Sequence, residues 1–177
     1  MQIWIALLRG INVGKHHRIA MADLILMMRD LGFENPGTLL NSGNLYFSSN
    51  EVSESAIKQA FIQGLAERFN LNNPVMVFPL QELENICLEN PFPPENFDPA
   101  KVQIGILSNQ SELSQLKTLN GESKTENWHI GQHAVYVYCA QGVHQSQLIK
   151  AIESRLKQKI TFRNLNTLNK LSKRLKP

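Results

Sequence analysis

Cysteines and long apolar runs are scarce in this sequence of 177 residues. Its two cysteines, Cys87 and Cys139, form no Cys-x-x-Cys pair, and we expect them to be inert core thiols of an intracellular protein. No segment has the apolar length needed to span a bilayer. Residues 1–8 are apolar but lack a preceding basic stretch and meet Arg9 at once, which favours a strand over a signal peptide. We therefore expect a cytoplasmic protein that makes no membrane contact.

Charge is unevenly distributed along the chain, although the net charge is only +3. Residues 81–140 hold three basic and eight acidic groups, whereas residues 141–177 hold nine basic groups and one acidic group. A basic C-terminal segment beside an acidic middle indicates either an anion-facing surface or contact between the two regions. The overall composition is that of a globular protein and excludes a disordered or fibrous chain.

The first half of the chain alternates between strand and helix patterns. Apolar residues recur at helical spacing over residues 21–31 and 57–69, and Ser53 is a predicted N-cap of the second helix. A third helix is predicted over residues 81–88, where the prolines of residues 91–94 end it. The remaining pattern predicts strands over residues 1–8, 38–40, 45–47 and 74–78, with a turn at residues 35–37.

The second half repeats this order of elements. A helix is predicted from Leu113, Leu116 and Leu119, closed by Asn120-Gly121. Asn164 is the predicted cap of the last helix. The remaining pattern predicts strands over residues 102–107 and 160–162, two strands within residues 128–138 about a turn at Gly131-Gln132, and helices over residues 148–156 and 165–175. Each half thus has the order strand, helix, two strands, helix, strand, helix.

This order predicts an α+β fold made of two tandem ferredoxin-like halves, each a βαββαβ unit plus an extra helix with a mostly antiparallel sheet. The predicted boundaries are residues 1–94 for the first half, 95–100 for a linker and 101–177 for the second half. A single larger sheet built from both halves is the alternative. Because residues 4–8 are apolar at nearly every position, we expect this strand to be buried on both faces, with some packing between the halves.

Several short segments resemble one bacterial family, called domain of unknown function 1697. They are Ala6-Leu7-Leu8-Arg9-Gly10-Ile11-Asn12-Val13-Gly14, Met21-Ala22-Asp23-Leu24, Ser42-Gly43-Asn44, Glu89-Asn90-Pro91-Phe92-Pro93 and Thr161-Phe162-Arg163-Asn164-Leu165-Asn166-Thr167. The chain departs from the family pattern at Lys15, Gln147 and Leu165, where glycine, lysine and tryptophan are common. The resemblance implies a two-part α+β fold over the whole chain and implies no reaction.

The loop between the first strand and the first helix is the main candidate for a binding site. Its glycines and Lys15 are one residue short of P-loop spacing, and no serine or threonine follows the lysine, which excludes a P-loop nucleoside triphosphatase. Its backbone N–H groups lie near the positive end of a predicted helix, and Arg9, Lys15 and Arg18 add charge, so an anion could bind there. The alternative is an ordinary strand-to-helix connection with solvated charges.

A second polar cluster follows the last predicted strand. If its arginine and amides face the opening loop, the two would form one pocket suited to phosphate, carboxylate or a nucleobase edge. Helix capping by Asn164 and turn chemistry at residues 41–44 are the structural alternatives. The predicted ligand-binding residues are Arg9, Gly10, Asn12, Gly14, Lys15, Arg18, Asn41, Ser42, Asn44, Arg163, Asn164, Asn166 and Thr167. The set contains no evident nucleophile, so it predicts recognition of a small anionic or nucleotide-like ligand.

Two other functions remain open. One is an enzyme, a hydrolase or transferase, with His16 or His17 as general base. The other is a nucleic-acid or protein interaction domain that uses the basic C-terminal segment, with Tyr136 and Tyr138 stacking bases on an open sheet face, although no RNP motif is present. We expect no metal and no cofactor, because His129 and His133, which would share a face of a continuous strand, have no helpfully spaced cysteine or carboxylate.

Overall fold

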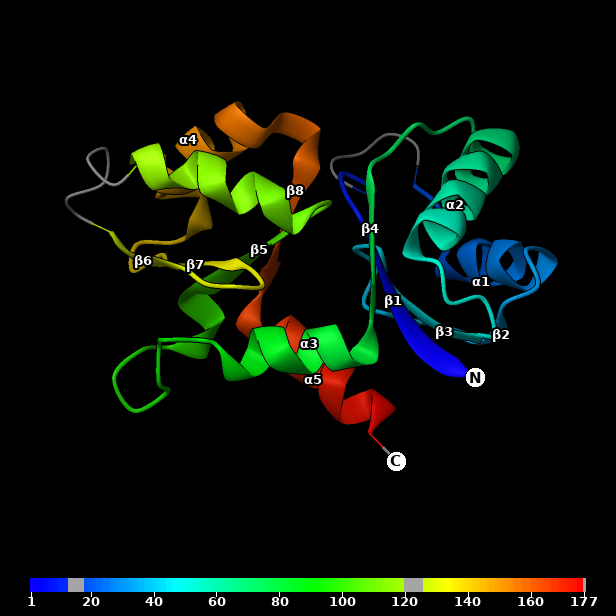
Figure 1. Ribbon diagram of the computed structural model, residues 1–177, viewed down its shortest axis with the longest axis horizontal. Coiled ribbons are helices and arrows are strands. Elements are labelled where there is room, and N and C mark those ends of the chain that lie inside the picture. The colour runs from blue at the N-terminus through cyan, green and yellow to red at the C-terminus, as the bar shows by residue number, and fades with distance from the viewer. Residues whose placement is uncertain (13–17, 120–125, 177) are drawn as a thin grey trace. The chain divides into compact units, whose positions relative to one another are not determined.

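The computed structural model describes residues 1–12, 18–119 and 126–176. It forms two compact units, Met1–Leu80 (unit 1) and Gln81–Pro177 (unit 2). Each unit contains a four-stranded antiparallel sheet. Figure 1 shows the strands and helices of each unit. The predicted α+β fold of two tandem ferredoxin-like halves is therefore confirmed, and the alternative of a single larger sheet is wrong. The predicted limits at residues 94 and 101 stay a prediction, since the division of the described chain falls at residue 80.

Unit 1 has the strand order β2-β3-β1-β4, in which the first strand lies inside the sheet. Its elements, in chain order, are β1 (Gln2–Leu8), α1 (Met21–Asp30), β2 (Glu34–Leu39), β3 (Asn44–Ser49), α2 (Glu54–Phe69) and β4 (Val75–Pro79). The hydroxyl of Ser53 accepts a hydrogen bond from the N–H of Ala56 at 3.3 Å, so the predicted N-cap of α2 is confirmed. Both helices pack on one face of the sheet (Figure 1).

The core of unit 1 follows the period-two alternation of β1. Trp4, Ala6 and Leu8 point to the face covered by α1 and α2 and belong to one cluster of buried apolar residues. The residues between them, Ile5 and Leu7, are 0% exposed as well. Burial of β1 on both faces is thus confirmed, whereas packing between the halves stays a prediction.

The turn predicted at Asn35-Pro36-Gly37 is wrong, because these residues belong to β2. The register of β2 against β3 shifts between Glu34 and Gly37, which marks a bulge. Gly37 pairs with Tyr46 across the strands, and a Cβ at position 37 would lie 2.2 Å from Cζ of that ring. The glycine therefore leaves room for the tyrosine ring, and its presence does not signal a chain reversal.

Unit 2 has the strand order β6-β7-β5-β8. It also contains α3, which starts at the last residue of unit 1 and lies in unit 2 from Gln81 onward. Its elements are α3 (Leu80–Leu88), η1 (Pro99–Lys101), β5 (Val102–Leu107), η2 (Gln110–Leu119), β6 (Asn127–Ile130), β7 (Val135–Tyr138), η3 (Val143–Gln145), α4 (Gln147–Leu156), η4 (Lys157–Lys159), β8 (Ile160–Asn164) and α5 (Leu165–Leu175).

The helix predicted from Leu113, Leu116 and Leu119, counted as an α-helix in the βαββαβ order, is instead the 3-10 helix η2. Its buried residues Leu113, Leu116 and Leu119 are spaced by three, and a helix with three residues per turn places all of them on one side. The spacing thus contained the correct period, which the prediction assigned to the wrong kind of helix. The closing turn expected at Asn120-Gly121 lies outside the described residues.

The sheet of unit 2 is covered on the face where an open surface was expected. Val135 and Val137 of β7 point into the core shared with η2 and α4, and Tyr136 points to the opposite face. Tyr136 is 0% exposed, and its hydroxyl donates a hydrogen bond to the carbonyl of Ile86 in α3 at 2.8 Å. Tyr138 packs edge-on against the ring of Phe97. The prediction that these tyrosines form an open stacking platform is therefore wrong.

Both cysteines are free thiols. Cys139 is buried, as expected of a core thiol, and Cys87 in α3 is partly buried. Burial raises the pKa of each thiol to about 11, so both are thiols rather than thiolates at neutral pH. No helix in the described part of the chain is long and apolar enough to cross a membrane.

Candidate functional site

The loop after β1 starts from a fixed backbone position. The N–H of Leu8 donates to the carbonyl of Gly43 at 2.8 Å, and the N–H of Arg9 donates to the carbonyl of Pro74 at 3.0 Å. The side-chain amide of Asn73 then donates to the carbonyl of Arg9 at 2.7 Å. Gly10 follows with φ +71°, a left-handed conformation that suits glycine. The start of the loop is thus held from both sides within unit 1.

Asn12 joins the two ends of this loop. Its Nδ2 donates to the carbonyl of Ile19 at 3.0 Å, and its Oδ1 accepts from the N–H of Ile19 at 2.8 Å. The same Nδ2 donates to the carbonyl of Asn41 at 2.9 Å, which ties the loop to the turn between β2 and β3. Asn12 itself is left-handed at φ 55°, a conformation that asparagine tolerates better than most residues. Its amide therefore shapes the loop.

The turn between β2 and β3 is built in a similar way. Asn44 is 0% exposed, and its Nδ2 donates to the carbonyl of Leu39 and to the hydroxyl of Ser42, both at 3.0 Å. Gly43 has φ +75°, and a Cβ there would lie 2.8 Å from Cβ of Leu8. Turn chemistry, which was the structural alternative for residues 41–44, is therefore present, and the buried Asn44 amide takes part in it.

An open pocket of about 490 Å³ lies beside this loop. It brings together three of the predicted ligand-binding residues, Asn12, Arg18 and Asn41, with the start of α1 at Ala20 and Met21. Among the described residues, no side chain caps this helix start, because the N-cap position is an alanine. The first turn of α1 carries the carboxylate of Asp23, whose N–H already donates to the carbonyl of Ala20 at 3.1 Å. The exposed guanidinium of Arg18 and the positive end of the helix are the features that favour an anion here.

Gly14 and Lys15 lie outside the described residues, as do His16 and His17, the two candidates for a general base. The enzyme hypothesis that rests on these histidines stays a prediction.

The polar cluster of residues 163–167 forms the junction between β8 and α5. Nη1 of Arg163 donates to the hydroxyl of Thr161 and to the carbonyl of Phe162, both at 2.9 Å. Burial lowers the pKa of Arg163 to about 10, which still leaves it charged at neutral pH.

Asn164 makes contacts on both sides of this junction. Its Oδ1 accepts from the N–H of Asn166 at 2.9 Å, so the predicted helix cap is confirmed, and its Nδ2 donates to the carbonyl of Ala100. Asn166 is exposed and Thr167 is partly buried. This cluster belongs to unit 2 and the opening loop to unit 1, and a pocket shared by the two stays a prediction.

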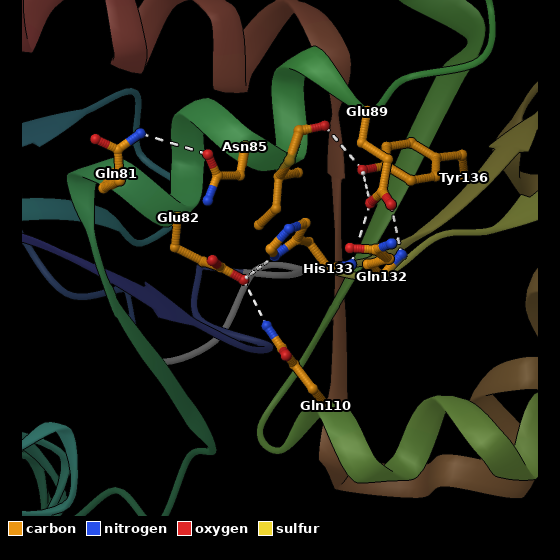
Figure 2. Close-up of polar contacts among 9 residues, drawn as sticks. Gln81, Glu82, Asn85, Glu89, Gln110, Gln132, His133 and Tyr136 are labelled. Atoms are coloured by element: carbon orange, nitrogen blue, oxygen red, sulfur yellow. Dashed lines mark hydrogen bonds and ion pairs between the residues drawn. The ribbon is translucent and has the colours of Figure 1, made fainter.

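A cluster of ionisable side chains that the sequence did not single out lies between α3 and the turn that joins β6 to β7 (Figure 2). Oε1 of Glu82 contacts Nδ1 of His133 at 2.8 Å and accepts from the amide of Gln110 at 2.6 Å. Seven residues after Glu82, just beyond the end of α3, Glu89 accepts hydrogen bonds from the main chain of that same turn and from Tyr136. Both carboxylates therefore face the β6–β7 turn.

The electrostatics of this cluster favour the charged form of Glu89. Partial burial by itself raises the pKa of Glu89, but the N–H groups of Gln132 and His133, the hydroxyl of Tyr136 and the charge of His133 together outweigh it, so its pKa is lowered from the ordinary glutamate value. Burial, with Glu89 next to it, raises the pKa of Tyr136, which therefore stays a neutral donor. The arrangement holds a proton on the phenol and a charge on the carboxylate.

The two histidines considered as a pair are not on one strand. His129 belongs to β6, whereas His133 lies beyond its end, before β7, so the continuous strand on which the two would share a face is not formed, and the predicted break between two strands is confirmed. Within the described ranges, no group of three or more histidine, cysteine, aspartate or glutamate side chains could hold a metal ion.

Sequence reasoning missed the role of Glu89 because its partners lie more than 40 positions away. Two local signals were available. Glu89 opens the Glu89-Asn90-Pro91-Phe92-Pro93 segment, and Gly131 marks the predicted turn between two strands. Neither signal predicts that Glu89 and the β6–β7 turn meet. Their contact arises only when the sheet of unit 2 forms and α3 packs on it.

Comparison with known proteins gives a fold and a family. The chain is similar in structure to a conserved bacterial protein, SP0830 from Streptococcus pneumoniae, with a TM-score of 0.81 and 24% sequence identity over 100% of this chain and 99% of that one. At this identity the likeness concerns the fold alone. No curated protein matches the chain. A family model described as a protein of unknown function, DUF1697, matches residues 1–136, a range that includes the opening motif but not residues 161–167. This chain therefore belongs to the DUF1697 family.

Proposed function

We propose that this protein binds a small anionic or nucleotide-like ligand at the loop after β1. The observation that supports this most is the pocket in which Arg18, Asn12 and Asn41 meet the start of α1. A guanidinium donates two parallel hydrogen bonds to phosphate or carboxylate, and the first turn of a helix attracts anions. Arg9, Gly14 and Lys15 belong to the same loop in the sequence and are part of the proposed site.

The loop is suited to binding because its ends are fixed in advance. Asn12 connects the exit of the loop at Ile19 to the neighbouring turn at Asn41. A site whose backbone is already ordered loses less conformational entropy when it binds a ligand. The hydrogen bonds of Asn12 therefore contribute to affinity without contact between its amide and the ligand.

A second pocket of about 430 Å³ supports a ligand with an apolar ring. It shares Arg18 and Ile19 with the first pocket, and Phe69 and Leu71 at the end of α2 supply an apolar wall. A ligand with its anionic group at Arg18 and a flat ring against Phe69 would use both pockets. This is why the proposal includes nucleotide-like ligands as well as simple anions.

A cytoplasmic location is part of the same proposal. The free thiols of Cys87 and Cys139 support it, because cysteines remain reduced in that compartment.

The test is thermal unfolding with inorganic phosphate and with a nucleoside monophosphate. We expect the Tm of the unaltered protein to rise with ligand concentration, since a ligand at 100 times its Kd stabilises the folded state by about 2.7 kcal/mol. Arg18→Ala should lose most of this shift. Arg29→Ala, which removes an exposed arginine at the other end of α1, is the matched control and should retain it. No shift in the unaltered protein at millimolar ligand would end the proposal.

A second candidate function is polyanion binding by α5. Lys170, Lys173 and Arg174 are exposed on the side of this helix opposite its buried leucines. If α5 binds a nucleic-acid backbone, affinity for single-stranded RNA must fall steeply as salt rises, because binding releases counterions. Binding that is absent at low salt, or that salt does not weaken, would exclude this function.

A further inference from the structure

The carboxylate of Glu89 fits closely into the turn between β6 and β7 (Figure 2). Its Oε1 accepts a hydrogen bond from the N–H of Gln132 at 2.5 Å. Its Oε2 accepts from the N–H of His133 at 3.1 Å and from the hydroxyl of Tyr136 at 3.0 Å. Each oxygen therefore has a main-chain donor of its own. The phenol adds a third contact, in which its single hydrogen is shared between Oε2 of Glu89 and the carbonyl of Ile86.

Gly131 leaves the space that the carboxylate occupies. A Cβ at position 131 would lie 2.4 Å from Cδ of Glu89, which is far closer than two unbonded carbons can approach. The φ of Gly131 is not in the left-handed region, so backbone conformation does not demand a glycine here. The close approach of the carboxylate does demand one.

We propose that the main-chain N–H groups of Gln132 and His133, the Tyr136 hydroxyl and the space above Gly131 form a carboxylate-binding site, which Glu89 occupies as an internal ligand and thereby holds α3 on the sheet of unit 2. All the groups that reach the carboxylate are donors, and they match its two oxygens. A neutral amide of the same shape would place its own N–H₂ against one of these donors. The site therefore takes a carboxylate, from this chain or from outside it.

The position of Glu89 directly after α3 explains why this one residue matters. Glu82, Ile86 and Glu89 are separated by four and three positions, so they lie on one side of the helix. Ile86 is buried under the hydroxyl of Tyr136, and Glu82 contacts His133 and Gln110. Glu89 is the contact after the last turn of α3, and without it the end of the helix would fray.

Cys87 reports on this fraying. It lies two residues before Glu89, partly buried, and Cys139 at 2% exposure is an internal reference within the same unit. Alkylation needs the thiolate and access to the reagent, and burial of α3 suppresses both. A loosened end of α3 therefore increases the alkylation rate of Cys87, while that of Cys139 stays low.

The experiment measures alkylation of each cysteine by iodoacetamide in the full chain, with the labelled peptides separated by mass spectrometry. We expect Glu89→Ala to raise the rate at Cys87 by about tenfold or more, as loss of charge-assisted hydrogen bonds implies. Sodium acetate should then lower the rate severalfold by occupying the vacated site. Sodium chloride at equal ionic strength and neutral acetamide should not.

Three further variants separate the site from general damage. Gln132→Ala removes a side chain but retains the main-chain donor, so the alkylation rate of Cys87 in this variant should match that in the unaltered protein. Gly131→Ala fills the space and should raise the rate with no response to acetate. Glu89→Gln keeps the volume, and should raise the rate, also without an acetate response because the site is filled.

Two results would overturn the proposal. One is an unchanged rate at Cys87 in Glu89→Ala, which would mean that Glu89 does not hold α3. The other is a raised rate on which acetate acts no more than sodium chloride or acetamide, which would mean that the turn does not bind carboxylates. If Glu89→Ala lacks the circular dichroism spectrum of the folded protein, the rate in Glu89→Gln decides, and an unchanged rate there rejects the proposal.

Discussion

Asn12 and Asn44, two asparagines of the candidate binding site, have hydrogen bonds that already build the fold. The amide of Asn12 bonds to Ile19 and Asn41, and that of Asn44 bonds to Leu39 and Ser42. A left-handed loop start and a tight turn leave main-chain groups without sheet partners, and asparagine side chains can satisfy them. Of the candidates that line the pocket, Arg18 is the one whose chemistry most directly suits an anion.

Asn12→Ala should destabilise unit 1. It removes three hydrogen bonds to the main chain and places an alanine at φ 55°, for a loss of about 3 kcal/mol in the free energy of unfolding. Urea denaturation followed by circular dichroism measures this loss. Asn41→Ala is the matched control, because Asn12 bonds to the main-chain carbonyl of residue 41, which alanine retains. Equal stability of the two variants would contradict the role given to Asn12.

At the scale of elements, two glycines mark places where another group comes unusually close. Gly37 of β2 lies under the ring of Tyr46 in β3, and Gly131 lies under the carboxylate that follows α3. Neither has the left-handed backbone that usually explains a glycine in a turn. A glycine inside a strand pattern can indicate such a close approach, which is why the turn predicted at residues 35–37 was wrong.

Gly37→Ala should weaken the pairing of β2 with β3. The added Cβ would meet Cζ of Tyr46 at 2.2 Å, so the ring must move, at a cost of about 2 kcal/mol in the free energy of unfolding. In a Tyr46→Ala background the same substitution should cost less than about 1 kcal/mol, because the obstructing ring is gone. Urea denaturation of the four proteins gives both values, and additive effects would contradict the steric explanation.

The stability contributed by the contact between Glu89 and the β6–β7 turn should depend on pH. Because the folded protein lowers the pKa of Glu89 from the value it has in the unfolded chain, the ionised carboxylate contributes stability above the unfolded pKa, and this contribution is lost as the pH falls through the lower, folded value. We expect the unaltered protein to exceed Glu89→Gln in free energy of unfolding at pH 6, and the difference to shrink towards pH 3. Urea denaturation at a series of pH values tests this. A constant difference would contradict it.

At the scale of the molecule, each unit has an apolar core of its own. In unit 1 the ring of Phe33 stacks on those of Phe47 and Phe61, which are tilted against each other, with centroids 4.2 to 5.4 Å apart, under α1 and α2. In unit 2, Ile152 of α4 packs with Val135 and Val137 of β7. Because each of these clusters lies within one unit, each can open with its own free energy.

Core substitutions should therefore act mainly on the unit that contains them. Phe61 is 0% exposed, and Phe61→Ala should lower the free energy of unfolding by about 4 kcal/mol. Hydrogen exchange should become faster in α1, α2 and β3. Ile152 is also 0% exposed, and Ile152→Ala should speed exchange in α4, β5 and β7 instead. Hydrogen exchange resolved by peptide measures both patterns. Equal acceleration in both units by either variant would contradict separate opening.

The sequence by itself determined the order of the elements, because alternation and helical spacing are local properties of the chain. It also determined the caps Ser53 and Asn164, since a cap bonds to an N–H group two or three residues away. It contained the spacing of Leu113, Leu116 and Leu119, although a period of three was assigned to an α-helix.

Only the tertiary structure decided which side chains meet across the chain. Asn12 reaches Asn41, Glu89 reaches Gln132, and Tyr136 is covered by α3 rather than open to a ligand. These contacts depend on the order of strands in each sheet and on which face a helix covers. A local pattern of residues does not encode either, because both are set by the burial of apolar surface over each unit as a whole.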